Sequence, residues 1–256
     1  MALEYRGVTK QFLTNGGAML TAVNNVSFHI EEGEFVSVVG PSGCGKSTIL
    51  SMTAGLYQPT NGEVLLNGEL VTAPNPKVGF MLQKDLLLPW RTIINNIEFG
   101  LEARRVPKAE RRERAMNELK HCHLSGFENH YPYQLSGGMR QRAALARTLA
   151  IDPAIVLLDE PFSALDAQTK MLLQNSFAKT IKEAARTTLL ITHDLSEAVL
   201  MSDRILVLSE RPGTIIAEIK VDLPHRDRPL ERRKLQEVND YAAELFQLLR
   251  LEEKAA

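Results

Sequence analysis

A glycine-rich segment between an apolar stretch and a helical stretch places the strongest constraint on the fold of this chain. The segment "GPSGCGKST" runs from Gly40 to Thr48 and satisfies the pattern G-x-x-x-x-G-K-[ST]. The apolar residues Phe35 to Val39 precede it, and the pattern "KSTILSMTAG" that follows is helical, with Gly55 as its natural end. The sequence therefore predicts a strand, a phosphate-binding loop and a helix in direct succession.

The residue types of this loop suit a nucleotide with several phosphates and a bound Mg2+. Its glycines let backbone N–H groups close around phosphate oxygens, and the N-terminus of the following helix adds the positive end of its dipole. Lys46 is expected to reach the outer phosphates, and Ser47 to offer its hydroxyl to Mg2+. The positions expected to contact the nucleotide are Gly40, Pro41, Ser42, Gly43, Cys44, Gly45, Lys46, Ser47 and Thr48.

Polar side chains follow three further apolar strands. Asp159 and Glu160 come at the end of "IVLLDEP", Thr192 and His193 at the end of "LLITH", and Gln83 after "GFML". In a parallel sheet such strand ends meet at the edge where ligands bind. We expect Asp159 to hold the Mg2+ shell and Glu160 to polarise the water that attacks the terminal phosphate. His193 is expected to contact that phosphate, with a hydrogen-bonded structural histidine as the alternative. Gln83 is expected to contact the metal or the water, with an ordinary polar residue at a strand end as the alternative.

A second anion-binding segment occurs in "QLSGGMRQR". Ser136, Gly137 and Gly138 stand at the start of a helix, where exposed N–H groups and a capping hydroxyl would bind an anion. A nucleotide already enclosed by the first loop leaves little triphosphate for this segment within the same chain, so we expect it to serve a nucleotide held by another copy. Asp166 in "PFSALDAQTK", which follows the carboxylate pair, is expected to come back towards the region of the first loop and the strand ends, with a helix cap as the competing explanation.

The order of elements predicts an α/β fold with a mostly parallel core sheet. Antiparallel strands, apart from residues 35–39, form an N-terminal β-subdomain, and residues 87–150 read as an inserted α-helical subdomain. Afterwards fully apolar short strands alternate with amphipathic helices, a pattern typical of a parallel sheet covered on both faces. We expect a nucleotide-binding domain over residues 1–225 and a C-terminal helical tail over residues 226–256.

The tail carries an apolar stripe at steps of three and four residues. Its members are Leu235, Val238, Ala242, Leu245 and Leu249. The stripe is expected to pack on the body of the protein, with docking of a partner helix as the alternative.

Bulk properties argue against several other classes of protein. The formal net charge of −1 argues against nucleic acid as an obligatory ligand. No apolar run approaches the roughly 20 residues that span a bilayer, so we expect a cytosolic chain that reaches a membrane only through partners. The two cysteines, Cys44 and Cys122, imply no disulfide framework. The "HCH" around Cys122 lacks a second cluster that would complete a metal site, and it is expected to be a solvated helix end.

Six motifs in one order resemble those of the nucleotide-binding subunit of ATP-binding cassette (ABC) transporters. They are "GPSGCGKST", "LQ" at Gln83, "LSGGMRQR", "LLDEP", "SALD" and "THD", and the resemblance covers nearly the whole chain. It implies the P-loop NTPase fold of an ABC cassette and a head-to-tail dimer that closes over two ATP molecules. Each ATP would lie between the phosphate loop of one subunit and the "LSGGM" helix of the other.

The resemblance also implies individual roles. Lys46, Ser47 and Thr48 would hold phosphates and Mg2+, Glu160 would act as general base, and Gln83 and His193 would sense and stabilise the γ-phosphate. Ser136 and Gly138 would clasp the partner's ATP. Phe12 matches the aromatic residue that stacks on adenine, whereas Tyr5 is expected in the core.

A finer resemblance connects the chain with the import ATPases of the nitrate/sulfonate/taurine/bicarbonate group. It is carried by "LLLPWRTIINNIEFGLE", "LDAQTK" and "VLSERPGTIIAEIKVDLPHRDRP". It implies a second ATP-binding subunit, identical or related, a separate membrane permease and, indirectly, a periplasmic or lipoprotein solute-binding protein. The chain would then lie peripherally on the cytoplasmic face of the inner membrane. Trp90, in the segment that would receive the permease, is either a contact residue or plain core.

Two other classes share these motifs. An exporter or lipid-transport ATPase would have every catalytic residue in common. An ABC-type ATPase that acts on nucleic acid would usually carry long coiled-coil insertions or two cassettes, and neither occurs in this sequence. The expected activity is therefore ATP hydrolysis coupled to transport across a membrane.

Overall fold

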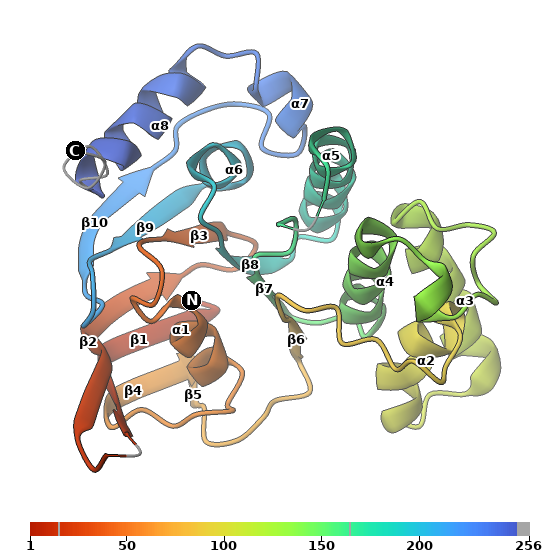
Figure 1. Cartoon of the computed structure of the whole chain (residues 1–256), viewed down its shortest axis with the longest axis horizontal. Coiled ribbons are helices and arrows are strands. Elements are labelled where there is room, and N and C mark those ends of the chain that lie inside the picture. The colour runs from red at the N-terminus through yellow and green to blue at the C-terminus, as the bar shows by residue number, and fades with distance from the viewer. Residues whose placement is uncertain (15, 164, 250–256) are drawn as a thin grey trace.

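The computed structural model describes residues 1–14, 16–163 and 165–249 as two β-sheets with helices around them (Figure 1). The larger sheet has the strand order β10-β9-β3-β8-β7-β6, and the smaller has the order β2-β1-β4-β5. The larger sheet consists of β3 (Phe35–Val39), β6 (Val78–Met81), β7 (Ile155–Asp159), β8 (Thr187–Ile191), β9 (Arg204–Leu208) and β10 (Ile215–Lys220). The smaller sheet consists of β1 (Leu3–Leu13), β2 (Met19–Ile30), β4 (Asn61–Leu66) and β5 (Glu69–Leu70).

Parallel pairing in the larger sheet brings the ends of four strands to one edge. Strand β3 pairs in parallel with β8 and β9, and β7 pairs in parallel with β8 and β6. Every residue of β3, β7, β8 and β9 is buried, as expected for apolar strands covered on both faces. The carboxyl ends of β3, β8, β7 and β6 therefore lie side by side.

The smaller sheet is antiparallel, as the sequence predicts. Strand β1 pairs with β2 and β4, and β4 turns back into β5. Asn67 and Gly68 form that turn with φ angles of 51° and 77°. Two consecutive positive φ values are the requirement of a type I′ hairpin turn, which explains the Asn-Gly pair.

The helices are divided between the two faces of the larger sheet and a separate helical region. Helix α1 lies between the sheets, where it contacts β2, β4, β7 and β8. Helix α6 packs on β3 from the opposite face, α8 packs on α6, and α2, α3 and α4 pack on one another (Figure 1). The helices are α1 (Lys46–Thr53), α2 (Ile93–Ala103), α3 (Lys108–His121), α4 (Gly137–Ala150), α5 (Ala167–Glu183), α6 (Leu195–Met201), α7 (Pro229–Arg232) and α8 (Glu237–Leu248), with a 3-10 turn at Pro132–Gln134.

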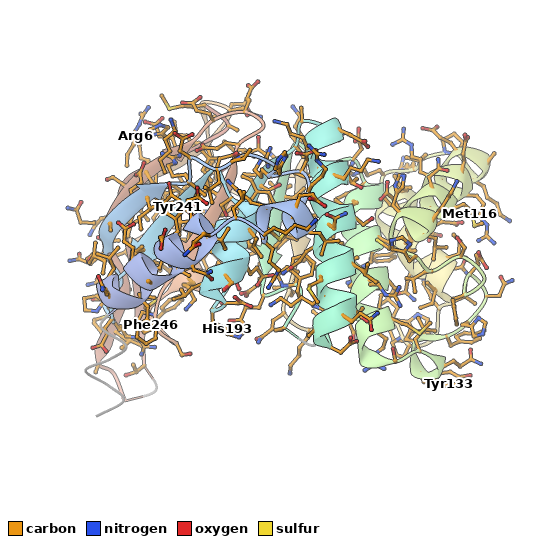
Figure 2. All side chains as sticks on the ribbon, turned by 90° about the horizontal axis from the view of Figure 1, so that it is seen from above. Arg6, Met116, Tyr133, His193, Tyr241 and Phe246 are labelled. Carbon is orange, nitrogen blue, oxygen red and sulfur yellow. The ribbon has the colours of Figure 1, made fainter. Side chains whose placement is uncertain are left out.

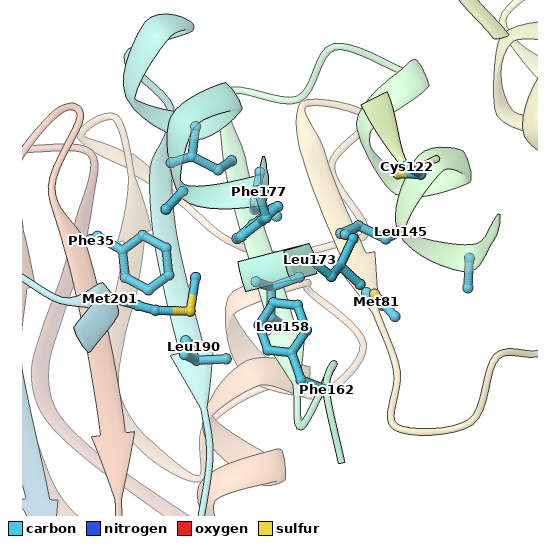
Figure 3. Close-up of a cluster of buried hydrophobic side chains, with 14 of the residues drawn as sticks. Phe35, Met81, Cys122, Leu145, Leu158, Phe162, Leu173, Phe177, Leu190 and Met201 are labelled. Atoms are coloured by element: carbon cyan, nitrogen blue, oxygen red, sulfur yellow. The ribbon is translucent and has the colours of Figure 1, made fainter. Parts of the chain in front are cut away.

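Two apolar cores hold the larger sheet in place from both sides. In β3, Val36 and Val38 belong to the core between the sheets, whereas Phe35 and Val39 belong to the core on the side of α5 and α6. Figure 3 shows the second core, in which the ring centroids of Phe35 and Phe177 are 6.3 Å apart. Burial on both faces fixes the strand ends, and hence the loops that leave them.

The helical region forms one end of the molecule. Met116 and Tyr133 lie at that end, and Arg6, Tyr241 and Phe246 lie towards the other (Figure 2). The chain enters this region after β6 and leaves it by α4, which contacts β6.

Two elements of the C-terminal part have no counterpart among the elements expected from the sequence. They are the antiparallel edge strand β10 and the short helix α7. The apolar stripe of the tail does pack on the body, since Val238, Leu245 and Leu249 belong to the main core and α8 contacts α6. Leu235 precedes α8 and is half-buried. Residues 250–256 of the tail, like Asn15 and Ala164, lie outside the described residues.

Three single-residue expectations can be compared with the structure. The expectation of a solvated "HCH" is wrong for Cys122, which is buried in the main core (Figure 3) because it continues, at steps of four and three residues, the buried face of α3 formed by Ala115 and Leu119. Trp90 is 71% exposed, so it is not a core residue. Tyr5 is a core residue, as expected, and its hydroxyl donates to the carbonyl of Ile49 at 2.7 Å.

Within the described ranges, no helix combines the length and the apolar character needed to cross a membrane. The same residues contain no cluster of three or more His, Cys, Asp or Glu side chains that could hold a metal ion.

Candidate nucleotide-binding and catalytic site

A cavity of about 660 Å³ opens where β3, β8, β7 and β6 end. It brings together ten of the residues that the sequence singles out, from the phosphate loop, the strand ends and β1. These residues are Phe12, Ser42, Gly43, Gly45, Lys46, Ser47, Thr48, Gln83, Glu160 and His193. The remaining wall is formed by Leu20, Ala22, Ile191 and Arg211, which the sequence analysis does not identify.

The phosphate loop has a backbone conformation that requires glycine at two positions. Gly43 and Gly45 have φ angles of 76° and 106°. A Cβ atom on Gly45 would lie 2.5 Å from Cγ1 of Val23 and 2.8 Å from the carbonyl oxygen of Ala22. The loop thus lies tightly against β2, and α1 begins immediately after it, with its first residues Lys46, Ser47 and Thr48 lining the cavity.

The side chain of Lys46 folds back onto the first residues of the phosphate loop. Its ammonium group donates to the carbonyl oxygens of Gly40 at 2.7 Å and Pro41 at 2.8 Å. The side chain is buried, so its charge acts in a medium of lower dielectric constant than water. A buried ammonium group beside exposed N–H groups is suited to bind an anion with several negative charges.

Glu160 is the centre of a polar cluster on the cavity wall. The side-chain amide of Gln83 donates to Oε2 of Glu160 at 3.1 Å, and Nδ1 of His193 lies 3.2 Å from the same oxygen. Strands β6, β7 and β8 each deliver one of these side chains. The sequence places them up to 110 residues apart, since 193 − 83 = 110, and the parallel sheet brings them together.

The backbone of Glu160 is unusual. Its φ angle is 48°, a left-handed conformation that costs a residue with a Cβ atom roughly 1 kcal/mol or more. Its N–H group donates to the carbonyl of Ile191 at 2.9 Å, which ties this conformation to the end of β8. The strained turn points the carboxylate into the cavity.

Asp159 lies one residue earlier and is more deeply buried. Burial raises the pKa of its carboxyl group, and the neighbouring Glu160 adds to this rise. A hydrogen bond with Ser47 and the charge of Lys46 oppose it. A carboxylate next to a hydroxyl fits Mg2+, which takes oxygen ligands and commonly binds one or two protein groups together with phosphate oxygens and water.

The backbone around His193 is anchored by hydrogen bonds and ion pairs of its neighbours. Thr192 donates a hydrogen bond from its hydroxyl to Glu197, and the N–H group of Asp194 donates to Oγ1 of Thr192 at 3.0 Å. Lys170 of α5 lies 2.9 Å from Asp194 and 3.5 Å from Glu197. The imidazole itself is largely exposed to the cavity, so its position depends on these neighbours.

The opposite end of the cavity is apolar. Phe12 and Leu20 are cross-strand partners in β1 and β2, and both line the wall. The ring of Tyr57 packs edge-on against Phe12 with centroids 5.4 Å apart, and the ammonium of Lys10 lies 5.1 Å from the centroid of Phe12. An aromatic ring beside an aliphatic wall suits a planar base.

The second glycine segment does not line this cavity. Ser136 caps α4, with its hydroxyl accepting from the N–H of Met139 at 3.3 Å, and Gly137 and Gly138 follow in the first turn. In Figure 1, α1 and α4 lie on different sides of β6 and β7. Asp166 caps α5, accepting from the N–H of Thr169 at 3.0 Å, and this bond lowers the pKa of its carboxyl group. Within one chain, Asp166 therefore has the capping role that the sequence leaves as the alternative.

The remaining members of the loop are placed behind the cavity wall. Gly40, Pro41 and Cys44 are not among its lining residues, although Gly40 and Pro41 hold Lys46 through their carbonyls. Cys44 is buried in the core between the sheets.

Comparisons with known proteins agree with this geometry. The family described as ABC transporter matches residues 23–163, more than half of the chain. An uncharacterized ABC transporter ATP-binding protein of Methanocaldococcus jannaschii is 47% identical over 248 residues, covering 97% of this chain and 91% of that protein. A nitrate import ATP-binding protein of Synechocystis sp. is 40% identical over 255 residues, covering 98% of this chain and 96% of that protein. A taurine import ATP-binding protein of Yersinia pestis bv. Antiqua is 42% identical over 205 residues, or 80% of each chain.

Solved structures show the same fold. A dimeric post-hydrolysis state of an ATP-binding cassette bound to ADP and Pi is similar to this chain with a TM-score of 0.77 at 36% identity. The match covers 86% of this chain and 98% of that chain. A second dimeric structure, of a bacterial ABC transporter cassette, matches with a TM-score of 0.78 at the same identity. The predicted fold class is thereby confirmed.

Proposed function

Because the chain belongs to the ABC transporter family, as an ATP-binding subunit that hydrolyses ATP, we propose that it powers an importer of small solutes. The solute would be of the nitrate, sulfonate, taurine or bicarbonate kind and would pass through a separate membrane permease. Two similar proteins named as import ATP-binding proteins, one for nitrate and one for taurine, support this assignment. The permease and a solute-binding protein would select the solute, and this chain would lie on the cytoplasmic face of the membrane.

The observation that carries the catalytic part of the proposal is the separation of the two glycine segments. One chain brings the phosphate loop, Gln83, Glu160 and His193 to one cavity, whereas Ser136 and Gly138 lie elsewhere. Two copies, or this chain and a related cassette, paired head to tail would place each serine-and-glycine turn over the partner's triphosphate. Asp166 would then lie near the same interface while still capping α5.

The residues of the cavity supply the parts that ATP hydrolysis needs. Lys46 and the loop N–H groups neutralise the phosphates, and Glu160 accepts a proton from the attacking water. Gln83 and His193, both in contact with Glu160, orient that carboxylate and the terminal phosphate. Mg2+, held by Ser47 with Asp159 and Gln83 close to its shell, would neutralise charge on the transferred phosphoryl group.

ATP binding would close the dimer, and hydrolysis would release it. Such a cycle converts the differential affinity of the open and closed states for ATP into motion of the permease. Trp90, exposed on the segment before α2, is our candidate for the permease contact. An exposed aromatic side chain of this size is typical of an interaction surface.

The composite site can be tested with two variants and one control. Glu160→Gln should abolish turnover and accumulate an ATP-bound dimer, measured by size-exclusion chromatography with light scattering. Adding Ser136→Arg to Glu160→Gln should prevent that dimer while leaving ATP binding to the monomer intact. Ser125→Arg, an exposed serine in the same helical region, is the matched control and should still dimerise. Dimerisation of the Ser136→Arg protein would contradict the proposed interface.

The transport role needs a separate experiment. Pull-down of the native complex should recover a permease, and reconstitution in liposomes should show ATPase stimulation by one of a panel of small oxyanions. Recovery of an exporter, with no stimulation by any solute of the panel, would contradict the importer assignment.

A further inference from the structure

We propose that Arg211, in the loop between β9 and β10, is a further nucleotide-binding residue that fixes the phosphate loop from its outer side. The proposal rests on ATP occupying the cavity described above, and it needs neither the dimer nor the permease. It is carried by a direct contact between two segments that are far apart in the sequence.

The guanidinium group of Arg211 donates two hydrogen bonds to one carbonyl of the phosphate loop. Its Nε and Nη2 atoms both donate to the carbonyl oxygen of Gly43, at 2.9 and 2.8 Å. A Cβ atom on Gly43 would lie 2.9 Å from Nη2 of Arg211, so glycine leaves the space that this contact occupies. The two residues are 168 positions apart, and only the folded chain joins them.

The loop that carries Arg211 is itself fixed to β2. Gly213 donates its N–H to the carbonyl of Ala22 at 2.9 Å, and its own carbonyl accepts from the N–H of Asn24 at 2.9 Å. A Cβ atom on Gly213 would lie 2.1 Å from the carbonyl oxygen of Cys44. The β9–β10 loop therefore packs closely against both the phosphate loop and β2, and these contacts fix the position of Arg211.

The contact with Gly43 has a consequence for the phosphate-binding side of the loop. In a trans peptide the C=O of one residue and the N–H of the next point in opposite directions. Holding the Gly43 carbonyl towards Arg211 therefore turns the N–H of Cys44 to the opposite side of the loop, where it donates to the carbonyl of Pro41 at 3.4 Å. Cys44 does not line the cavity, but its neighbours Gly43 and Gly45 do, so the contact with Arg211 fixes the shape of the part of the loop that a phosphate meets.

Arg211 also contributes charge. A guanidinium group has five N–H donors, and the carbonyl of Gly43 takes two of them. Arg211 also lines the cavity, so its positive charge lies near a polyphosphate bound there. The bonds of Arg211 go to Gly43, whereas Gln83 and His193 hold Glu160. We therefore assign Arg211 to nucleotide affinity and not to the hydrolysis step.

The test compares nucleotide affinity with turnover in the full-length protein. For Arg211→Gln, the Kd for ATP and for ADP, titrated with fluorescent analogues, should rise roughly three- to tenfold, the range of one or two net hydrogen bonds. The kcat at saturating ATP should stay within about twofold of the wild-type value. Arg211→Lys keeps the charge but not the paired N–H donors, and should restore part of the affinity. The control is Arg228→Gln, which removes an exposed arginine beside Asp227 outside the cavity.

Three outcomes would overturn the proposal. An unchanged Kd in Arg211→Gln would remove Arg211 from the binding site. A kcat that falls while Kd stays constant would place it in the chemical step. A rise of the Kd in Arg228→Gln as large as that in Arg211→Gln would show that removing any arginine weakens nucleotide binding, and the contact with Gly43 would then explain none of the loss. Failure of the wild-type protein to bind ATP would instead refute the assignment of the cavity itself.

Discussion

Lys170 provides the sharpest test of how the segment around His193 is held. Its ammonium group lies 2.9 Å from Asp194 and 3.5 Å from Glu197. The side chain of Glu197 is only 3% exposed. It also accepts hydrogen bonds from the hydroxyl of Thr192 and, at 3.1 Å, from the side-chain amide of Gln174. Lys170→Met keeps the volume of the side chain and removes the charge. It leaves a buried carboxylate with two neutral partners and no cation.

The size of the effect follows from the burial of the pair. Removing one partner of a buried ion pair costs about 3–5 kcal/mol. Lys170 is 19% exposed, and Glu197 keeps two hydrogen bonds, so we expect a cost at or just below the lower limit of that range, about 2–3 kcal/mol. Lys179→Met on the same helix is the control, since Lys179 is 66% exposed and pairs with Glu183 at 3.8 Å. An exposed pair of this kind contributes about 0.3–0.5 kcal/mol.

The loss of stability in Lys170→Met should depend on pH in a definite direction. Burial raises the pKa of Glu197, with Lys170 the strongest influence in the opposite direction. The folded state therefore binds the proton of the Glu197 carboxyl group more tightly than the unfolded chain does. The resulting stabilisation is greatest below the ordinary glutamate pKa, and it is lost as the pH rises through the pKa of Glu197 in the folded state. Without Lys170 the folded pKa rises further, so the deficit of Lys170→Met should shrink as the pH is lowered from 8 towards about 5.

The assay is urea unfolding followed by circular dichroism at several pH values. Lys170→Met should lose about 2–3 kcal/mol near neutral pH, and Lys170→Met/Glu197→Gln should recover a large part of it because the buried charge is gone. A loss no larger than that of Lys179→Met, or one that does not vary with pH, would refute this account of the buried network.

Two further predictions concern the cavity and the exposed aromatic residue. Gly45→Ala should weaken nucleotide binding at least tenfold in a fluorescence titration, because the φ angle of Gly45 is 106° and the added Cβ would clash with Val23. The control is Gly16→Ala, which has no atom within 4 Å of the added Cβ and should bind the nucleotide as the wild-type protein does. Equal affinities of the two variants would contradict the argument. Trp90→Ala should change the free energy of unfolding by less than about 0.5 kcal/mol, because the ring is exposed, but should abolish ATPase stimulation by the permease; a large loss of stability would show that the ring is structural.

The catalytic side chains could be predicted from the sequence because they obey simple local rules. Gln83, Glu160 and His193 each follow a short apolar strand, and parallel strands place their carboxyl ends at one edge. The same reasoning locates the phosphate loop and the helix after it. What the pattern could not supply was the left-handed backbone of Glu160, which depends on its hydrogen bond to the end of β8.

The parts that sequence reasoning missed depend on tertiary contacts. Strand β10 is an edge strand whose residues are mostly half-exposed or exposed, so its apolar pattern is weak. Arg211 joins the phosphate loop only after β9 and β10 have formed, and no local pattern marks it. Cys122 ends a helix that is mostly charged, and the short apolar face that it shares with Ala115 and Leu119 is a weak signal in the sequence. The division into domains at residues 87–150 and 226–256 remains a prediction.

The most direct test of the composite site is the specific ATPase activity of the isolated protein measured over serial dilution. If hydrolysis requires a serine-and-glycine turn from a second chain, activity per protomer should fall in proportion to protein concentration once monomers predominate, and saturating ATP should not restore it. Activity per protomer that stays constant down to the lowest measurable concentration would contradict the account.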